Sequence, residues 1–222
     1  MGMFLNSIEP YDKYKTITKG LYFVDKTELL EELIPALEQE QRFFCITRPR
    51  RFGKTVMENM IASFFEKSEG GSDIFDRLKI SEYPKYKEHL NKHDVVYIDF
   101  SEMPKECDSY KKYISRIEEG IYYDLREKYS DLYLKQEDAI WDIFSKIFNE
   151  TKKKFIFVMD EWDAVFHMSF MTEKNREDYL LFLKLLLKGQ SYVELAYMTG
   201  VLPIAKYSDG SELNLSLIHI SE

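Results

Sequence analysis

The chain has 222 residues, with 31 Lys and Arg against 39 Asp and Glu and a formal net charge of −8. Hydrophobic residues make up 45% and aromatic residues 15% of the sequence, which excludes a disordered chain and suffices for one α/β core. The acidic balance argues against a surface that coats nucleic acid, although a local basic site stays open. Two cysteines are too few for a disulfide framework, and no apolar run is long enough for a membrane span, so we expect a cytoplasmic protein.

Helices and strands are expected to alternate from the start of the chain. The segment FVDKTELLEELIPALEQ places Asp25 as a helix N-cap with Glu28 three residues later, as in a capping box, and predicts a helix from Lys26 to Glu40. The run RFFCIT, Arg42 to Thr47, predicts a strand buried on both faces. From Thr55 onward apolar residues recur at helical spacing, so this strand leads to a helix through an arginine-rich loop.

The rest of the chain continues this alternation. The expected strands are Asp94–Phe100, Phe155–Glu161 and Val193–Gly200, and the expected helices are Tyr110–Tyr129, Ala139–Lys154 and Asn175–Gly189. Strands separated by helices of this length imply βαβ crossovers and a largely parallel sheet. We therefore expect an α/β sandwich of three layers, with a mainly parallel sheet between helices.

The stretch CITRPRRFGKTV, Cys45 to Val56, lies between an expected strand and an expected helix. A strand, a loop and then Gly53-Lys54-Thr55 opening a helix form the setting of a phosphate-binding P-loop. Gly53 would let the backbone approach a phosphate, Lys54 would reach the outer phosphates, and Thr55 would offer its hydroxyl to Mg²⁺. For the tripeptide alone, an ordinary helix start with a solvated lysine is the alternative.

The loop departs from the general P-loop pattern at its first position, where Arg48 stands in place of glycine. Arg48 would be strained only if that position required a positive φ, and Pro49 favours an extended conformation there. Arg50 and Arg51 would add positive potential over a triphosphate, or Arg50 could pair with an acidic neighbour. The expected nucleotide-binding residues are Arg50, Arg51, Phe52, Gly53, Lys54, Thr55 and Val56.

A second signal comes from FIFVMDEWD, an apolar strand that ends in Asp160 and Glu161. Parallel sheets bind ligands beyond the carboxyl ends of their strands. Successive side chains along a strand diverge, so Asp160 is expected in the Mg²⁺ shell and Glu161 on the attacking water. The alternative is a pair of solvated turn or N-cap residues, and the upstream loop favours the catalytic interpretation.

Thr199 ends the run ELAYMTG, on a strand that we expect between the other two strands of the site. There its hydroxyl could sense the γ-phosphate or position water, whereas a simple turn residue before Gly200 is the alternative. The four histidines, His89, His93, His167 and His219, do not show the spacing of zinc ligands.

These segments, together with YFVDKTELLEEL, VVYIDFSE and YMTGVLPIAKYSDGSELN, resemble the bacterial AAA-ATPase-like family of P-loop NTPases over nearly the whole chain. RPRRFGKT resembles that family's own P-loop, in which arginine replaces the first glycine. The resemblance implies ATP and Mg²⁺ as ligands. It assigns nucleotide binding to Gly53, Lys54 and Thr55, the Walker B pair to Asp160 and Glu161, and the sensor position to Thr199.

The resemblance also implies what lies beyond the ATPase-like region. Family members often carry a PD-(D/E)XK nuclease-like domain downstream, so nucleic acid is implied as a partner only through such a domain. We expect residues 1–214 to form the P-loop domain. The ending SLIHISE resembles translated sequencing-adaptor read-through, so residues 215–222 are expected to be a non-natural tail and the natural protein to be longer; a genuine edge strand is the alternative.

The expected function is Mg²⁺-dependent ATP binding and hydrolysis, with Lys54, Glu161 and Thr199 as catalytic residues and Thr55 and Asp160 as metal ligands. The alternative is a nucleotide-gated binding module with little hydrolysis, coupled to the nuclease-like domain. A nucleotide is the expected partner, a homo-oligomer stays open, and no membrane partner is expected.

Overall fold

The computed structural model describes residues 2–39, 42–49, 51–67 and 74–202. Its centre is a four-stranded sheet in the order β1-β4-β3-β2, and every pair of neighbouring strands is parallel. The strands are β1 (Phe43–Thr47), β2 (Asp94–Asp99), β3 (Phe155–Asp160) and β4 (Val193–Gly200). The α/β sandwich with a parallel sheet is confirmed, and all four predicted strands are present.

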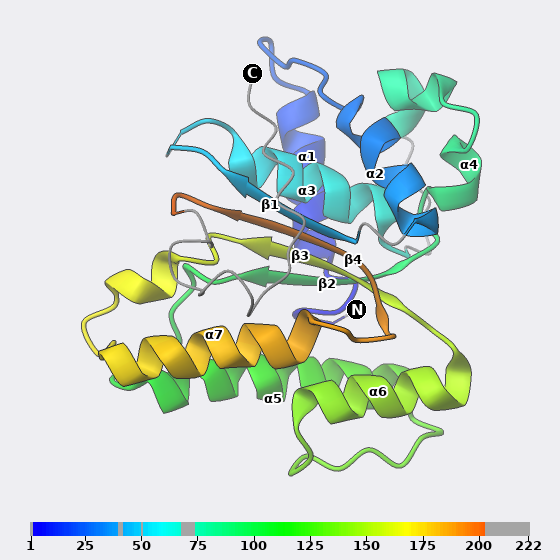
Figure 1. The fold of residues 1–222 in the computed structure, drawn as a ribbon. Helices are drawn as coiled ribbons and strands as arrows, with labels where there is room; N and C mark the ends of the chain where they lie inside the picture. Colours follow the sequence, from blue (N-terminus) through cyan, green and yellow to red (C-terminus); the bar gives the residue numbers. More distant parts are fainter. Residues whose placement is uncertain (1, 40–41, 50, 68–73, 203–222) are drawn as a thin grey trace.

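Helices cover both faces of the sheet, as Figure 1 shows. On one face lie α1 (Ile8–Thr18), α2 (Leu29–Glu38), α3 (Lys54–Phe65) and the short α4 (Tyr86–His89). On the other face lie α5 (Tyr110–Lys128), α6 (Ile140–Thr151) and α7 (Glu173–Leu187). Three short 3₁₀ helices complete the described elements at Phe75–Arg77, Lys79–Glu82 and Ala164–His167.

Each face of the sheet contributes to its own hydrophobic core, because successive residues of a strand point to opposite sides. On β3, Ile156 and Val158 belong to the core formed with α2 and α3, whereas Phe155, Phe157 and Met159 belong to the core formed with α5, α6 and α7. All six residues of β3 are buried. A strand that is buried on both faces has the continuous apolar sequence that predicted it.

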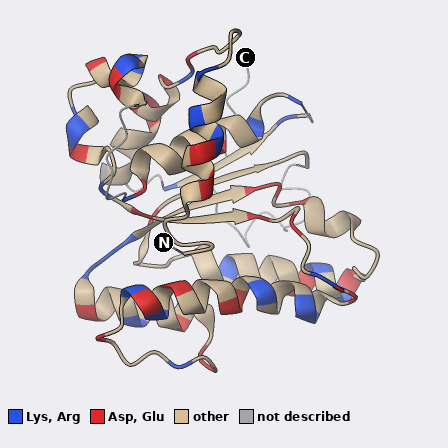
Figure 2. Ribbon diagram, turned by 180° about the vertical axis from the view of Figure 1, so that it is seen from behind, with Lys and Arg blue, Asp and Glu red and all other residues tan. Residues whose placement is uncertain are grey.

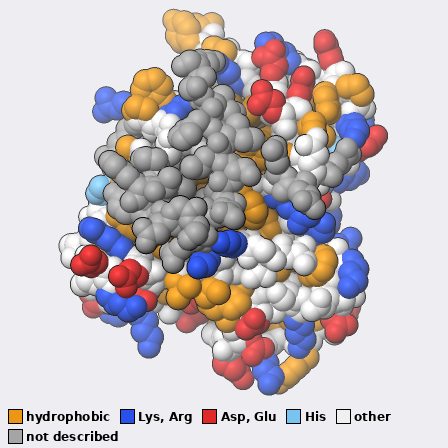
Figure 3. All heavy atoms as spheres, in the orientation of Figure 1, with side chains coloured by type: hydrophobic (Ala, Val, Ile, Leu, Met, Phe, Trp, Pro, Cys, Tyr) orange, Lys and Arg blue, Asp and Glu red, His pale blue; other side chains and the backbone are white. Residues whose placement is uncertain are grey.

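Charged residues occur mainly on the helices, the loops and the ends of the strands (Figure 2). On the face shown in Figure 3, Lys and Arg are interspersed with Asp and Glu among the described residues.

The beginning of the chain differs from the sequence prediction. The helix α1 was not predicted; it buries only Pro10 and Tyr14, so its apolar pattern is weak, and it packs against α3. The predicted capping box is wrong, because α2 starts at Leu29 and Asp25 instead accepts hydrogen bonds from Thr27 and from the distant Lys79 backbone N–H at 2.7 Å. A long-range partner has therefore replaced a local cap.

The expected tail at 215–222 lies outside the described residues, as do all residues from 203 onward. Within the described ranges, no helix is both long and apolar enough to traverse a lipid bilayer.

Candidate functional site

The carboxyl ends of the four strands meet along one edge of the sheet. The register pairs Ile46 of β1 with Thr199 of β4, and Asp99 of β2 with Asp160 of β3. Because β4 lies between β1 and β3, Thr199 stands between the strand that leads into the arginine-rich loop and the strand that ends in Asp160. The Arg48 N–H extends the β1–β4 pairing by donating to the Gly200 carbonyl at 3.2 Å.

The loop after β1 closes on itself through Lys54, the first residue of α3. The Lys54 ammonium donates to the Arg48 carbonyl at 3.0 Å, and the Lys54 residue is buried. The alternative of a solvated lysine at an ordinary helix start is therefore excluded. Lys54 instead reaches back over the loop, where a bound phosphate could replace the Arg48 carbonyl as its partner.

The backbone of this loop explains why Arg48 is tolerated. Positive φ angles occur at Arg51, with 71°, and at Gly53, with 76°, but not at Arg48. A bulky residue is strained only where φ is positive, so arginine at the first position costs no strain. Arg51 carries the left-handed conformation instead.

The other predicted loop residues differ in exposure. Phe52 is 63% exposed, the Arg51 and Thr55 side chains are exposed, and Val56 is half-buried. Arg50 lies outside the described residues. The loop thus presents an aromatic ring, a guanidinium and a hydroxyl to solvent near the N-terminus of α3, whose backbone N–H groups favour anions.

Asp160 and Thr199 form the buried part of the edge. The Thr199 hydroxyl donates to Asp160 Oδ1 at 2.9 Å, and the two residues are only 0% and 1% exposed, respectively. These values exclude a solvated turn for either residue. The central strand β4 pairs with β1 on one side and is joined to the end of β3 on the other side by this side-chain hydrogen bond.

Glu161 was predicted to be the last residue of this strand, but β3 ends at Asp160. The φ of 47° at Glu161 turns the chain away from the strand, and the Trp162 N–H donates to the Thr199 carbonyl at 2.9 Å. The Asp163 carboxylate then accepts from the N–H groups of Val201 at 3.0 Å and Leu202 at 2.7 Å. The turn after β3 is thus fastened to the end of β4, with Asp160 inside the sheet edge and Glu161 half-exposed outside it.

Gly200 is required by this close packing. A Cβ atom at Gly200 would come within 2.5 Å of the buried Trp162 ring nitrogen and 2.7 Å of the Asp163 carboxylate. Any side chain at this position would therefore force the turn away from β4.

Sequence reasoning missed Glu58, one helical turn after Lys54 on α3. Glu58 is 0% exposed, and neither of its carboxylate oxygens has a hydrogen-bond partner among the described residues. Burial raises the pKa of Glu58 well above its usual range, and the adjacent Asp160 carboxylate raises it further. Its place four residues after Lys54, on the same side of the helix, is the signal that could have identified it.

Asp99 adds a further carboxylate at the end of β2. Burial is the main cause that raises the pKa of Asp99, and the Asp160 charge adds to it, while hydrogen bonds from Ser101 act in the opposite direction. In the described part of the chain, no ion pair joins a Lys or Arg to Glu58, Asp99 or Asp160. Three carboxylates thus gather at this edge without a Lys or Arg ion-pair partner among the described residues.

The described side chains at this edge could supply only some of the ligands that a divalent cation needs. Over residues 2–39, 42–49, 51–67 and 74–202, no three Asp, Glu, His or Cys side chains converge enough to hold a metal ion. Mg²⁺ usually keeps several waters and binds through one or two carboxylates plus phosphate oxygens. The orphaned Glu58 carboxylate beside Asp160 is the observation that fits such a cation.

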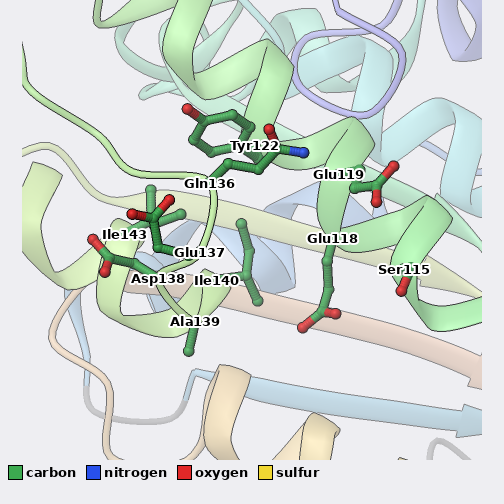
Figure 4. Close-up of a pocket in the computed structure, with 10 residues that line it drawn as sticks. All are labelled: Ser115, Glu118, Glu119, Tyr122, Gln136, Glu137, Asp138, Ala139, Ile140 and Ile143. Atoms are coloured by element: carbon green, nitrogen blue, oxygen red, sulfur yellow. The ribbon is translucent and has the colours of Figure 1, made fainter. Parts of the chain in front are cut away.

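A cavity of about 270 Å³ opens elsewhere, between α5 and the segment that leads into α6 (Figure 4). It is lined by Ser115, Glu118, Glu119, Tyr122, Gln136, Glu137, Asp138, Ala139, Ile140 and Ile143. None of the predicted site residues lines it, so it is separate from the edge described above.

One histidine cluster was also not expected. His93 contacts His89 at 3.0 Å and Glu194 at 3.0 Å, so the fold supplies an acidic partner that no i, i+4 spacing indicated. Glu194 lies near the amino end of β4, at the opposite end of the strand from Thr199. The cluster is therefore no part of the candidate site.

The sheet order, the glycine-lysine-threonine loop at the start of α3 and the acidic end of β3 define a P-loop NTPase-like α/β protein. A family model described as a predicted AAA-ATPase matches residues 8–208, and the chain belongs to this AAA-ATPase-like family. Membership supports nucleotide binding and ATPase activity as the general function. No curated protein matches the chain. The downstream nuclease-like domain stays a prediction.

Proposed function

We propose that this chain binds ATP with Mg²⁺ at the carboxyl edge of its sheet and hydrolyses the γ-phosphate. The observation that carries the proposal is the placement of β4 between β1 and β3. This order brings the buried Lys54 and the Asp160–Thr199 pair to one edge, beside the N-terminus of α3. Family membership supports the same activity.

The phosphates would lie over the loop between Arg48 and Lys54. Their oxygens would accept from the backbone N–H groups at the start of α3 and from the Lys54 ammonium, which would leave the Arg48 carbonyl. The exposed Arg51 would add positive charge, and Arg50 would extend it. The Phe52 ring, which is 63% exposed, would cover the ligand from outside the loop.

The acidic end of β3 would hold the cation and the attacking water. Thr55 and Asp160 would hold Mg²⁺, and the bound ion would neutralise part of the negative charge of the phosphates. Glu161 would orient a water molecule in line with the γ-phosphate, because the turn after Asp160 directs it away from the sheet. Thr199 would hold the Asp160 carboxylate in place through its 2.9 Å hydrogen bond.

The test is single-turnover hydrolysis of ATP by the wild type and by Glu161→Gln, with nucleotide binding measured separately. The variant is expected to bind a fluorescent ATP analogue as the wild type does and to lose at least 100-fold in hydrolysis rate, on the scale of a lost general base. Glu173→Gln, at an exposed position in the first turn of α7, is the matched control and should change neither quantity.

Hydrolysis at an equal rate in Glu161→Gln and the wild type would show that Glu161 is wrongly assigned. Tight binding without turnover in the wild type would favour the alternative of a nucleotide-gated binding module. Absence of nucleotide binding in the wild type would contradict both functions.

A further inference from the structure

The fully buried carboxylate of Glu58 requires an explanation that the P-loop motif does not supply. Glu58 lies on α3, one turn after Lys54, and no hydrogen bond of good geometry reaches either of its carboxylate oxygens from the described residues, although Asp160 and Thr199 lie next to it. Buried ionised groups are rare unless they are paired or coordinate a metal. An ionised carboxylate at this position therefore requires a bound cation, and without a cation the group holds a proton.

The surroundings of Glu58 indicate the charge of that ligand. Its neighbours are the Asp160 carboxylate and the Thr199 hydroxyl, and the hydroxyl already donates to Asp160 at 2.9 Å. Asp99 adds negative charge from β2. The buried Tyr97 hydroxyl, for which Glu58 and Asp160 are the principal nearby charges, also has no partner in the described part of the chain. Two adjacent carboxylates repel each other unless a cation or a proton lies between them.

We propose that Glu58 is a second carboxylate of the divalent-cation site, facing the cation from α3 while Asp160 faces it from β3, directly or through a metal-bound water. The inference rests on the proposed function, because the cation is the one that accompanies the nucleotide. Two carboxylates, phosphate oxygens and retained waters make up the usual shell of Mg²⁺. The residue thus tunes cation affinity, and the P-loop itself retains nucleotide binding.

A variant that keeps the shape of Glu58 and removes its charge distinguishes the contribution of Glu58 to cation affinity from the contribution of the P-loop to nucleotide binding. In Glu58→Gln, the Mn²⁺ affinity of the ADP complex is expected to fall at least tenfold, on the scale of altered metal-supporting groups. ADP binding in EDTA should not weaken, because the substitution removes negative charge near the phosphates.

Glu66→Gln is the matched control. Glu66 is the C-cap of α3, about 12 Å further along the helix axis, and it is also buried with one carboxylate oxygen that lacks a partner. It lies beyond the candidate site, so both affinities should equal those of the wild type. The control separates an effect at the cation site from the general effect of neutralising a buried glutamate on this helix.

The experiment measures free Mn²⁺ by electron paramagnetic resonance in the presence of ADP, and the binding of mant-ADP in EDTA, for the whole 222-residue chain. Unchanged Mn²⁺ affinity in Glu58→Gln would overturn the inference and leave the proposed function intact. Absence of mant-ADP binding to the wild type would instead refute the proposed function. If Glu58→Gln does not fold, Glu58→Asp decides: an Mn²⁺ affinity below that of the wild type supports the cation role, and an equal affinity overturns it.

Discussion

The hydrogen bond between Thr199 and Asp160 offers a direct test of how the site edge is held together. Thr199→Val preserves the shape of the side chain and removes the hydroxyl that donates to Asp160 Oδ1 at 2.9 Å. Both residues are buried, and no Lys or Arg of the described ranges forms an ion pair with the Asp160 carboxylate. A hydrogen bond to a charged group contributes about 1.5–3 kcal/mol, and its loss leaves a buried carboxylate unpaired. We expect the free energy of unfolding to fall by about 2 kcal/mol.

The measurement is urea unfolding followed by tryptophan fluorescence, since Trp162 is fully buried beside the end of β4. In a chain of this length, about 2 kcal/mol corresponds to a fall of about 4–8 °C in the melting temperature. Thr199→Ser is the control, because it keeps the hydroxyl and loses one methyl group, at a cost of about 1 kcal/mol. A Thr199→Val protein as stable as the wild type would refute the reasoning.

Three further predictions concern the loop, the turn and one buried acid. Gly53→Ala should cost about 1 kcal/mol in unfolding free energy, because φ is 76° while no described residue lies within 4 Å of an added Cβ. Gly189→Ala, with φ of 70° and equally open surroundings among the described residues, should cost as much, and only Gly53→Ala should weaken binding of mant-ATP. Asp163→Asn should lower the unfolding free energy by about 1–2 kcal/mol in urea titrations, because the carboxylate that accepts from two backbone N–H groups loses its charge; an unchanged midpoint would contradict this. Burial raises the pKa of Glu66 from 4.5 to about 8, so the folded wild type binds this proton more tightly than the unfolded chain and loses stability as the pH rises through that interval. The unfolding free energy of Glu66→Gln relative to that of the wild type should therefore rise by up to about 1.4 kcal/mol per pH unit between these two pH values. A difference that does not depend on pH would contradict the burial argument.

The strands and the P-loop could be predicted because their signals are local. A strand buried on both faces is apolar throughout, and Phe155 to Met159 has no polar residue to interrupt the pattern. The loop before α3 is recognised by a short motif in a strand-to-helix setting. Even the place of Thr199 between two other site strands followed from that setting, and the register of β1 and β4 agrees.

The start of the chain could not be predicted for the opposite reason. The helix α1 buries only two of its residues, so its sequence lacks the apolar stripe that identifies a helix. Asp25 has the sequence of an N-cap but accepts from Lys79, 54 residues away, and no local rule includes such a partner. Tertiary contacts decided both outcomes.

Glu58 shows how tertiary packing can hide a candidate functional residue. In sequence, Glu58 and Asn59 interrupt the apolar pattern of α3 and indicate a solvated face. In the structure α3 contacts α1 as well as β2 and β3, and Glu58, Asn59 and Ser63 are all buried. The neighbours of Glu58 are Asp160 of β3 and Thr199 of β4, so Glu58 faces the sheet. Its spacing from Lys54 was the one local signal, and its pairing with Asp160 depends on the tertiary packing of α3 on the sheet.

The most direct test of the central claim is the affinity of the wild type and of Lys54→Ala for mant-ATP in the presence of Mg²⁺. Lys54 is the buried cation of the loop, and its contact with the Arg48 carbonyl is the one that a phosphate would replace. The account predicts saturable binding by the wild type, at least tenfold weaker binding by Lys54→Ala, and wild-type affinity in the control Lys112→Ala, at an exposed position on α5. Equal affinity in Lys54→Ala and the wild type, or no binding by the wild type, would contradict it.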